Sequence, residues 1–135
     1  SPGNYQTVHI KIQHGKLISI RREKTLLHAL KKLGMDLEPV YCGGEDETWN
    51  MEREQWHSGA NFFCVAPGKV LGYYTVEAMN NAGFEIIRAN DVISNKVDLN
   101  KYEKYMITIE GSELPRGGGG ARCMTMPINR DAVEW

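Results

Sequence analysis

The chain has 135 residues and a formal net charge of −1, which is the length of a single domain. Its 41% hydrophobic and 24% charged residues are ordinary for a globular domain, and the balanced charge argues against nucleic acid and membranes as partners. The three cysteines lack CxxC spacing, which argues against a disulfide framework or a zinc site. We therefore expect a cytoplasmic protein with no metal and no cofactor.

The first expected module, about residues 5–42, has the order ββαβ. Two β-rich runs, "VHIKIQ" and "KLISI", flank a turn at Gly15 and Lys16. Leucines at helical spacing then predict a helix, and Gly34 is suited to end it. The run "MDLEPVYC" is expected to be the last strand of this module.

A connecting segment, residues 43–58, is polar and is expected to be a solvated loop, with a binding loop as the alternative. A second ββαβ module, about residues 59–110, repeats the pattern of the first. Its hairpin tip is expected at Pro67 and Gly68, its helix at "TVEAMNNAG" up to Gly83, and its closing strand at "FEIIRAN". The polar run "DVISNKVDLNKYEKY" reads as a surface insertion before a further strand, "MITIEGSEL". Repeat folds generally need three or more units, so two modules suggest part of a larger α/β structure.

Residues 111–135 are expected to be a loop and tail, the candidate active-site loop of the chain, in which four glycines precede "ARCMTMP". A phosphate cradle is disfavoured because no helix follows the glycines, and a flexible linker because fewer than twenty residues remain. The remaining interpretation is a tight turn that presents Cys123. From the residues alone, a reactive thiolate and a buried structural thiol both remain open for Cys123. Cys42 and Cys64, in apolar runs, are expected to be core residues.

The segment "ELPRGGGGARCMTMPINRD" closely resembles the C-terminal signature of arginine deiminases. Similar landmarks of that family precede it in the same order: "ISIRREKTLLHAL", "EREQWHSGAN" and "PGKVLGY". The resemblance implies a pentein fold, a five-bladed α/β-propeller of ββαβ modules, of which this chain would supply two. It also implies that Cys123 attacks the guanidinium carbon of L-arginine, giving citrulline and ammonia. Gly117 and Gly118 would then lie against the substrate, and Arg116 would supply a cation there.

The resemblance also implies a proton-shuttling histidine in a His-x-Asp segment, and carboxylates that pair with the guanidinium. None of the four histidines is followed by x-Asp, and among them His28 is expected at the surface of its helix. We therefore expect a C-terminal fragment that is inactive alone and completed by the remaining N-terminal part of the enzyme. The alternatives are a non-catalytic guanidine-binding or interaction domain, and a sibling enzyme such as an agmatine deiminase or amidinotransferase. Exposed strand edges would also favour a homo-oligomer.

Overall fold

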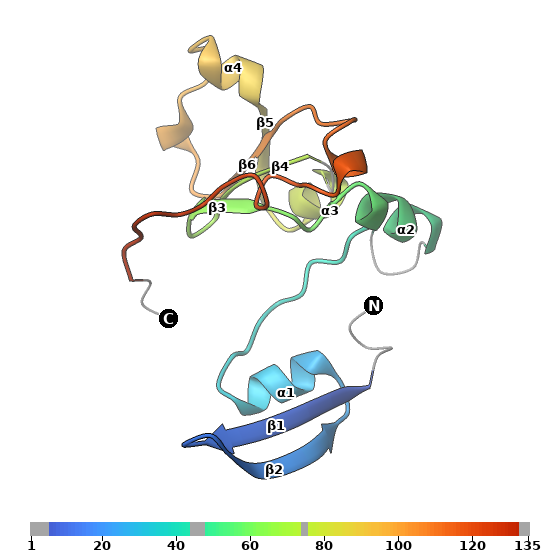
Figure 1. Ribbon diagram of the computed structural model, residues 1–135. Coiled ribbons are helices and arrows are strands. Elements are labelled where there is room, and N and C mark those ends of the chain that lie inside the picture. Colours follow the sequence, from blue (N-terminus) through green and yellow to red (C-terminus); the bar gives the residue numbers. More distant parts are fainter. Residues whose placement is uncertain (1–5, 44–47, 74–75, 133–135) are drawn as a thin grey trace. The chain divides into compact units, whose positions relative to one another are not determined.

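The computed structural model describes residues 6–43, 48–73 and 76–132, and divides the chain into two compact units, Ser1–Pro39 and Val40–Trp135 (Figure 1). Both contain strands and helices, and the described residues form one sheet of two strands and one of four. The expected mixed α and β class is therefore confirmed.

The first unit is a β-hairpin followed by a helix. Strands β1 (Thr7–Gln13) and β2 (Lys16–Glu23) pair antiparallel, with Gln13 opposite Lys16. The two loop residues are therefore His14 and Gly15, with φ of 50° and 73°. The turn lies one residue earlier than predicted, because a two-residue hairpin loop that matches the strand twist needs positive φ at both of its positions.

Helix α1 (Leu26–Lys32) has local signals at both ends. The side chain of Thr25 accepts a hydrogen bond from the backbone N–H of His28 at 3.1 Å, which caps the N-terminus. At the other end Gly34 has φ 87°, and the N–H of Met35 donates to the carbonyl of Leu30. This is the Schellman geometry that a glycine after the last turn permits, so the predicted stop at Gly34 is confirmed.

The predicted last strand of the first module is wrong. Residues 35–41 contain no strand, and Met35, Leu37 and Val40 are exposed. An extended run becomes a strand only where its backbone groups pair with a neighbour, and the hairpin sheet of this unit ends at β1 and β2. The described part of the first module is therefore ββα.

The second unit contains a four-stranded mixed sheet (Figure 1). Its order is β3 (Phe63–Ala66), β4 (Lys69–Gly72), β6 (Tyr105–Thr108) and β5 (Glu85–Arg88). Strands β3 and β4 form the predicted hairpin, whereas β6 pairs parallel to both β4 and β5. The strand predicted near "MITIEGSEL" thus lies in the middle of the sheet, and the second module is ββαβ with this strand inserted between its parts.

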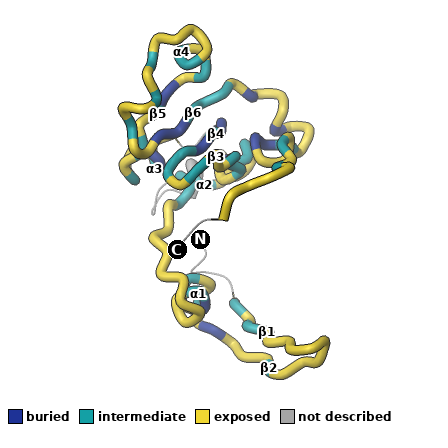
Figure 2. Tube along the Cα trace, turned by 90° about the vertical axis from the view of Figure 1, so that its left-hand side faces the viewer, coloured by how far each residue is buried: buried dark blue, intermediate teal, exposed yellow. Residues whose placement is uncertain are grey.

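Helix α3 (Val76–Asn81) ends in the same way as α1. Gly83 has φ 84°, and the N–H of Phe84 donates to the carbonyl of Met79 at 3.0 Å. Met79 packs with Val70 and the fully buried Met106 into the core of this unit, against Phe62, Phe84 and Ile86. Figure 2 shows buried residues on β4, β5 and β6, and the segment 111–121 also contains buried positions.

The prediction that Cys64 is a core residue is wrong: its side chain is exposed, and Cys42 is only partly buried. Cys64 lies on β3, which is an edge strand of the sheet, so an apolar sequence neighbourhood did not translate into burial. His28 has a side chain 43% exposed, as predicted for a surface position of its helix.

The connecting segment, predicted to be a solvated loop, contains helix α2 (Thr48–Trp56). The carboxylate of Glu54 on this helix accepts a hydrogen bond from the backbone N–H of Gly43 at 2.6 Å. The predicted surface insertion begins at Asp91, inside helix α4 (Ala89–Ile93), and contains the 3₁₀ turn η1 (Leu99–Lys101). Ile93 is 79% exposed there. Among the described residues, none of the helices is long and apolar enough to cross a membrane.

Candidate active site

Cys123 lies in a compact turn over residues 120–125. The N–H of Met124 donates to the carbonyl of Gly120 at 3.3 Å, and the hydroxyl of Thr125 donates to the carbonyls of Ala121 and Arg122. Ala121 is 2% exposed and anchors the turn, whereas Cys123 is exposed. The segment is therefore a turn, as predicted, and it presents an exposed Cys123.

Asn61, in the loop between α2 and β3, holds this turn. Its Oδ1 accepts hydrogen bonds from the backbone N–H groups of Arg122, at 2.7 Å, and Cys123, at 3.3 Å. Its Nδ2 lies 2.9 Å from the Sγ of Cys123. One side chain thus contacts the backbone and the sulfur of the same residue.

The surroundings of Cys123 favour its thiolate. The pKa of the thiol is lowered first by a hydrogen bond from the backbone of Gly120, then by the Asn61 side chain, and further by the charge of Arg122. Partial loss of solvent opposes these effects and raises the pKa. The net direction is downward, which is the condition for a cysteine to act as a nucleophile near neutral pH.

Tyr73 lies next to the turn and is almost fully buried, with 4% of its surface exposed. Its hydroxyl lies 3.9 Å from the sulfur of Met124. Burial raises the pKa of Tyr73, and the nearby Cys123 raises it further, so its hydroxyl stays protonated beside a thiolate. The tyrosine ring leaves no room for a side chain at Gly111, where a Cβ would lie 2.4 Å from the ring.

Two of the four glycines have a visible backbone role. Gly118 caps the 3₁₀ turn η2 (Pro115–Gly117) with φ 80°, a conformation that suits glycine. At Gly120, a Cβ would lie 2.4 Å from the Asn61 side chain, so only glycine leaves room for that contact. At Gly117 and Gly119 a Cβ would meet open space.

Arg116, Gly117 and Gly118 lie together at η2 and are exposed. The guanidinium of Arg116 pairs with the carboxylate of Glu113 at 3.3 Å, and both side chains are 75% exposed. The predicted site residues thus occupy the two ends of the glycine run, with Cys123 at one end and Arg116 at the other.

The sequence profile of the arginine deiminase family matches residues 4–130. The chain belongs to the arginine deiminase family. It is 34% identical over 117 residues to an arginine deiminase of Mycoplasma capricolum subsp. capricolum, and this match covers 83% of the chain and 24% of the relative. The chain therefore spans about a quarter of the length of this curated relative.

Asn61 contacts Cys123, although the sequence pattern assigned no role to Asn61. A signal was present, because Asn61 ends the "EREQWHSGAN" landmark of the family. Its partner Cys123 is 62 positions away in the sequence, so the contact between the two residues is visible only in the folded chain.

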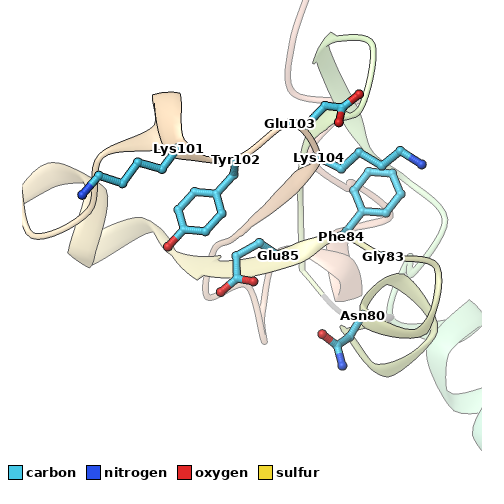
Figure 3. A pocket seen from close by; sticks show the side chains of 8 residues that line it. All are labelled: Asn80, Gly83, Phe84, Glu85, Lys101, Tyr102, Glu103 and Lys104. Atoms are coloured by element: carbon cyan, nitrogen blue, oxygen red, sulfur yellow. The ribbon is translucent and has the colours of Figure 1, made fainter.

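Two surface pockets of the second unit lie outside the Cys123 turn. One, of about 410 Å³, lies between β5 and the η1 region (Figure 3), where Lys101 and Lys104 offset Glu85 and Glu103. The other, of about 880 Å³, lies between β3 and residues 127–132, where Arg130 donates to the carbonyl of Cys64. In the described part of the chain, no three His, Cys, Asp or Glu side chains gather to hold a metal ion.

Proposed function

We propose that this chain carries the nucleophile of an arginine deiminase, and that the nucleophile is Cys123. The observation that carries the proposal is the set of donors around the sulfur, from Gly120 and Asn61, together with the adjacent charge of Arg122. Hydrogen bonds to a thiolate and a nearby cation are the ordinary means of activating a cysteine. The family membership supplies the guanidine substrate.

In the proposed reaction, the thiolate of Cys123 attacks the guanidinium carbon of L-arginine and forms a C–S bond. A C–N bond then breaks, and the nitrogen leaves as ammonia after it receives a proton. Water attacks the same carbon of the covalent adduct, the C–S bond breaks, and L-citrulline leaves while the thiolate is restored. One difficult substitution is thereby divided into two easier steps.

This chemistry needs groups beyond Cys123. A general acid and base must protonate the ammonia and activate the water, and carboxylates must pair with the planar guanidinium. We propose that an N-terminal part of the same enzyme supplies these groups, so that this stretch alone turns over little or no arginine. The match to about a quarter of the relative's length supports this division.

Arg116, Gly117 and Gly118 are the proposed contacts for the amino-acid end of the substrate. The Arg116–Glu113 pair is highly exposed, and such surface pairs contribute roughly 0–1 kcal/mol. A substrate carboxylate can therefore replace Glu113 as the partner of Arg116 at little cost. The exposed backbone of Gly117 and Gly118 leaves the approach to η2 open.

The wider assembly is also a proposal. We propose that the two units are parts of a pentein α/β-propeller, in a cytoplasmic hydrolase that acts on C–N bonds and forms homo-oligomers. The exposed isoleucines and valine of the β1–β2 hairpin support this, because a two-stranded hairpin is marginally stable unless its apolar face is covered.

The test is citrulline release from L-arginine by this chain, by a separately expressed N-terminal part of the enzyme, and by the two together. We expect turnover from the mixture that neither part gives alone, and its loss on Cys123→Ser. Robust turnover by the chain alone would contradict the division of catalytic groups. An inactive mixture that still binds arginine would favour the non-catalytic guanidine-binding domain.

A further inference from the structure

The orientation of the Asn61 side chain is fixed by hydrogen bonding. Two backbone N–H groups, of Arg122 and Cys123, point at one atom of its amide group. That atom must be the acceptor Oδ1, because the amide NH₂ group only donates. The NH₂ group therefore faces the Sγ of Cys123 at 2.9 Å, and the sulfur must accept.

We propose that Asn61 is a positioning residue for the nucleophile, in which Oδ1 holds the Cys123 turn and Nδ2 donates to the sulfur. The two tasks fall on two atoms of one planar group, so the position of the turn and the placement of the donor are set together. This inference rests on the proposed role of Cys123, although its test needs no arginine turnover.

Gly120 belongs to the same arrangement. A Cβ at this position would lie 2.4 Å from Cγ, 2.5 Å from Cβ and 2.6 Å from Oδ1 of Asn61. These distances are far inside van der Waals contact, so a larger residue would displace the Asn61 side chain. Gly120 thus makes room for Asn61, in addition to donating from its own backbone toward the sulfur.

Two other titratable side chains act on Cys123. Arg122 carries a positive charge that favours the thiolate, and buried Tyr73 is neutral near pH 7. Because the Arg122 N–H donates to Asn61 Oδ1, removal of the whole side chain can also move the Arg122 charge, whereas a carboxylate at position 61 keeps this acceptor in place. Asn61→Asp separates the two tasks, because a carboxylate still accepts from the turn but cannot donate to the sulfur when ionised.

The experiment measures iodoacetamide labelling of the 135-residue chain across pH. The thiolate displaces iodide to form a C–S bond, and mass spectrometry of peptides reads Cys123 separately from exposed Cys64, which serves as internal reference. The variants are Asn61→Asp, Asn61→Ala and Gly120→Ala. The control for Asn61→Asp is Asn100→Asp, which adds the same charge on η1. The control for Gly120→Ala is Gly119→Ala, because a Cβ added at position 119 would meet open space.

We expect Asn61→Asp to slow labelling of Cys123 at pH 7 by at least about tenfold and to move its pH profile upward, since it replaces a donor by a negative charge. The Cys64 rate and both controls should remain as in the parent chain. Asn61→Ala and Gly120→Ala should also slow labelling of Cys123, and their combination should be no slower than the slower of the two single variants.

A Cys123 profile in Asn61→Asp that matches Asn100→Asp would overturn the inference, as would additive effects of Asn61→Ala and Gly120→Ala. If Asn61→Ala does not fold, the comparison of Asn61→Asp with Asn100→Asp decides alone. An upward shift of the profile in Asn61→Asp, together with no citrulline release when the parent chain is mixed with the N-terminal part of the enzyme, would support the positioning role and contradict the proposed function.

Discussion

The Nδ2 atom of Asn61 lies 2.9 Å from the Sγ of Cys123, although 62 positions separate the two residues in the chain. Through this contact the loop that precedes β3 meets the turn that follows the glycine run. The contact brings together two sequence landmarks of the arginine deiminase family, and it accounts for the glycine at position 120. The candidate nucleophile is therefore held from outside its own loop.

Arg116 is expected to bind the carboxylate of the substrate in the complete enzyme. Arg116→Ala should raise KM for arginine by about tenfold with kcat largely retained, since it removes binding that is equal in ground and transition states. Steady-state kinetics measure both constants. Glu113→Ala is the matched variant, and it should leave KM unchanged or lower it because the competing carboxylate is gone. A fall in kcat at constant KM for Arg116→Ala would place Arg116 in the chemical step instead.

Gly118 is expected to be required for the shape of the glycine run. With φ 80°, alanine at this position should cost about 1 kcal/mol of unfolding free energy. Gly119→Ala should be neutral or slightly stabilising, because it meets open space and removes freedom from the unfolded chain. Urea denaturation of the chain measures both. Equal stabilities of the two variants would show that the left-handed backbone at Gly118 does not constrain the folded chain.

Glu23 should make the stability of the first unit depend on pH. Its side chain is 3% exposed and its carboxylate accepts from the Lys32 ammonium at 2.7 Å, a hydrogen bond that holds the pKa of Glu23 below its usual range. A lowered folded pKa means that this stabilisation is fully present above the unfolded value and is lost as pH falls through the folded one.

Hydrogen-exchange protection of β1, β2 and α1 measures this effect. Glu23→Gln should reduce protection at pH 7, and the loss of protection as pH falls below about 5 should be smaller in this variant than in the parent chain. Glu110 is exposed, so Glu110→Gln should change neither the protection at pH 7 nor its dependence on pH. Identical protection in the parent chain and in Glu23→Gln at pH 7 would exclude the stabilising role of this ion pair.

Met106 is expected to be the residue on which the core of the second unit depends most. It is fully buried on the central strand β6, so Met106→Ala should cost about 2–5 kcal/mol of unfolding free energy. Met126→Ala is the matched control, because Met126 is 83% exposed and should change stability by less than about 0.5 kcal/mol. Thermal and urea unfolding followed by circular dichroism compare them, and a small loss for Met106→Ala would mean that the core collapses around the cavity.

Features with local causes were predictable from sequence. Gly34 and Gly83 each end a helix by a backbone conformation that glycine favours, so the signal and the structure lie within a few residues. The expected strand after Gly34 and the expected burial of Cys64 failed because each depends on a partner elsewhere in the chain. A strand needs a neighbouring edge, and a residue on an edge strand needs a covering layer.

The candidate site also contains one residue that the sequence could indicate and one that it could not. Cys123 could be singled out because a specific motif surrounds it, whereas Asn61 could not, because its role depends on a contact made only in the folded chain. The glycine run likewise appeared as one signal in the sequence, although the structure gives Gly118 and Gly120 different tasks.

Covalent labelling with 2-chloroacetamidine, a small amidine that resembles the guanidinium group, tests most directly whether Cys123 is the nucleophile. The thiolate displaces chloride, and peptide mass spectrometry then locates the adduct and gives the rate at each of the three cysteines. We predict that Cys123 is labelled first and faster than exposed Cys64, and that Cys123→Ser removes this rapid phase. Labelling at Cys42 or Cys64 at the same rate as at Cys123, or ahead of it, would contradict the assignment.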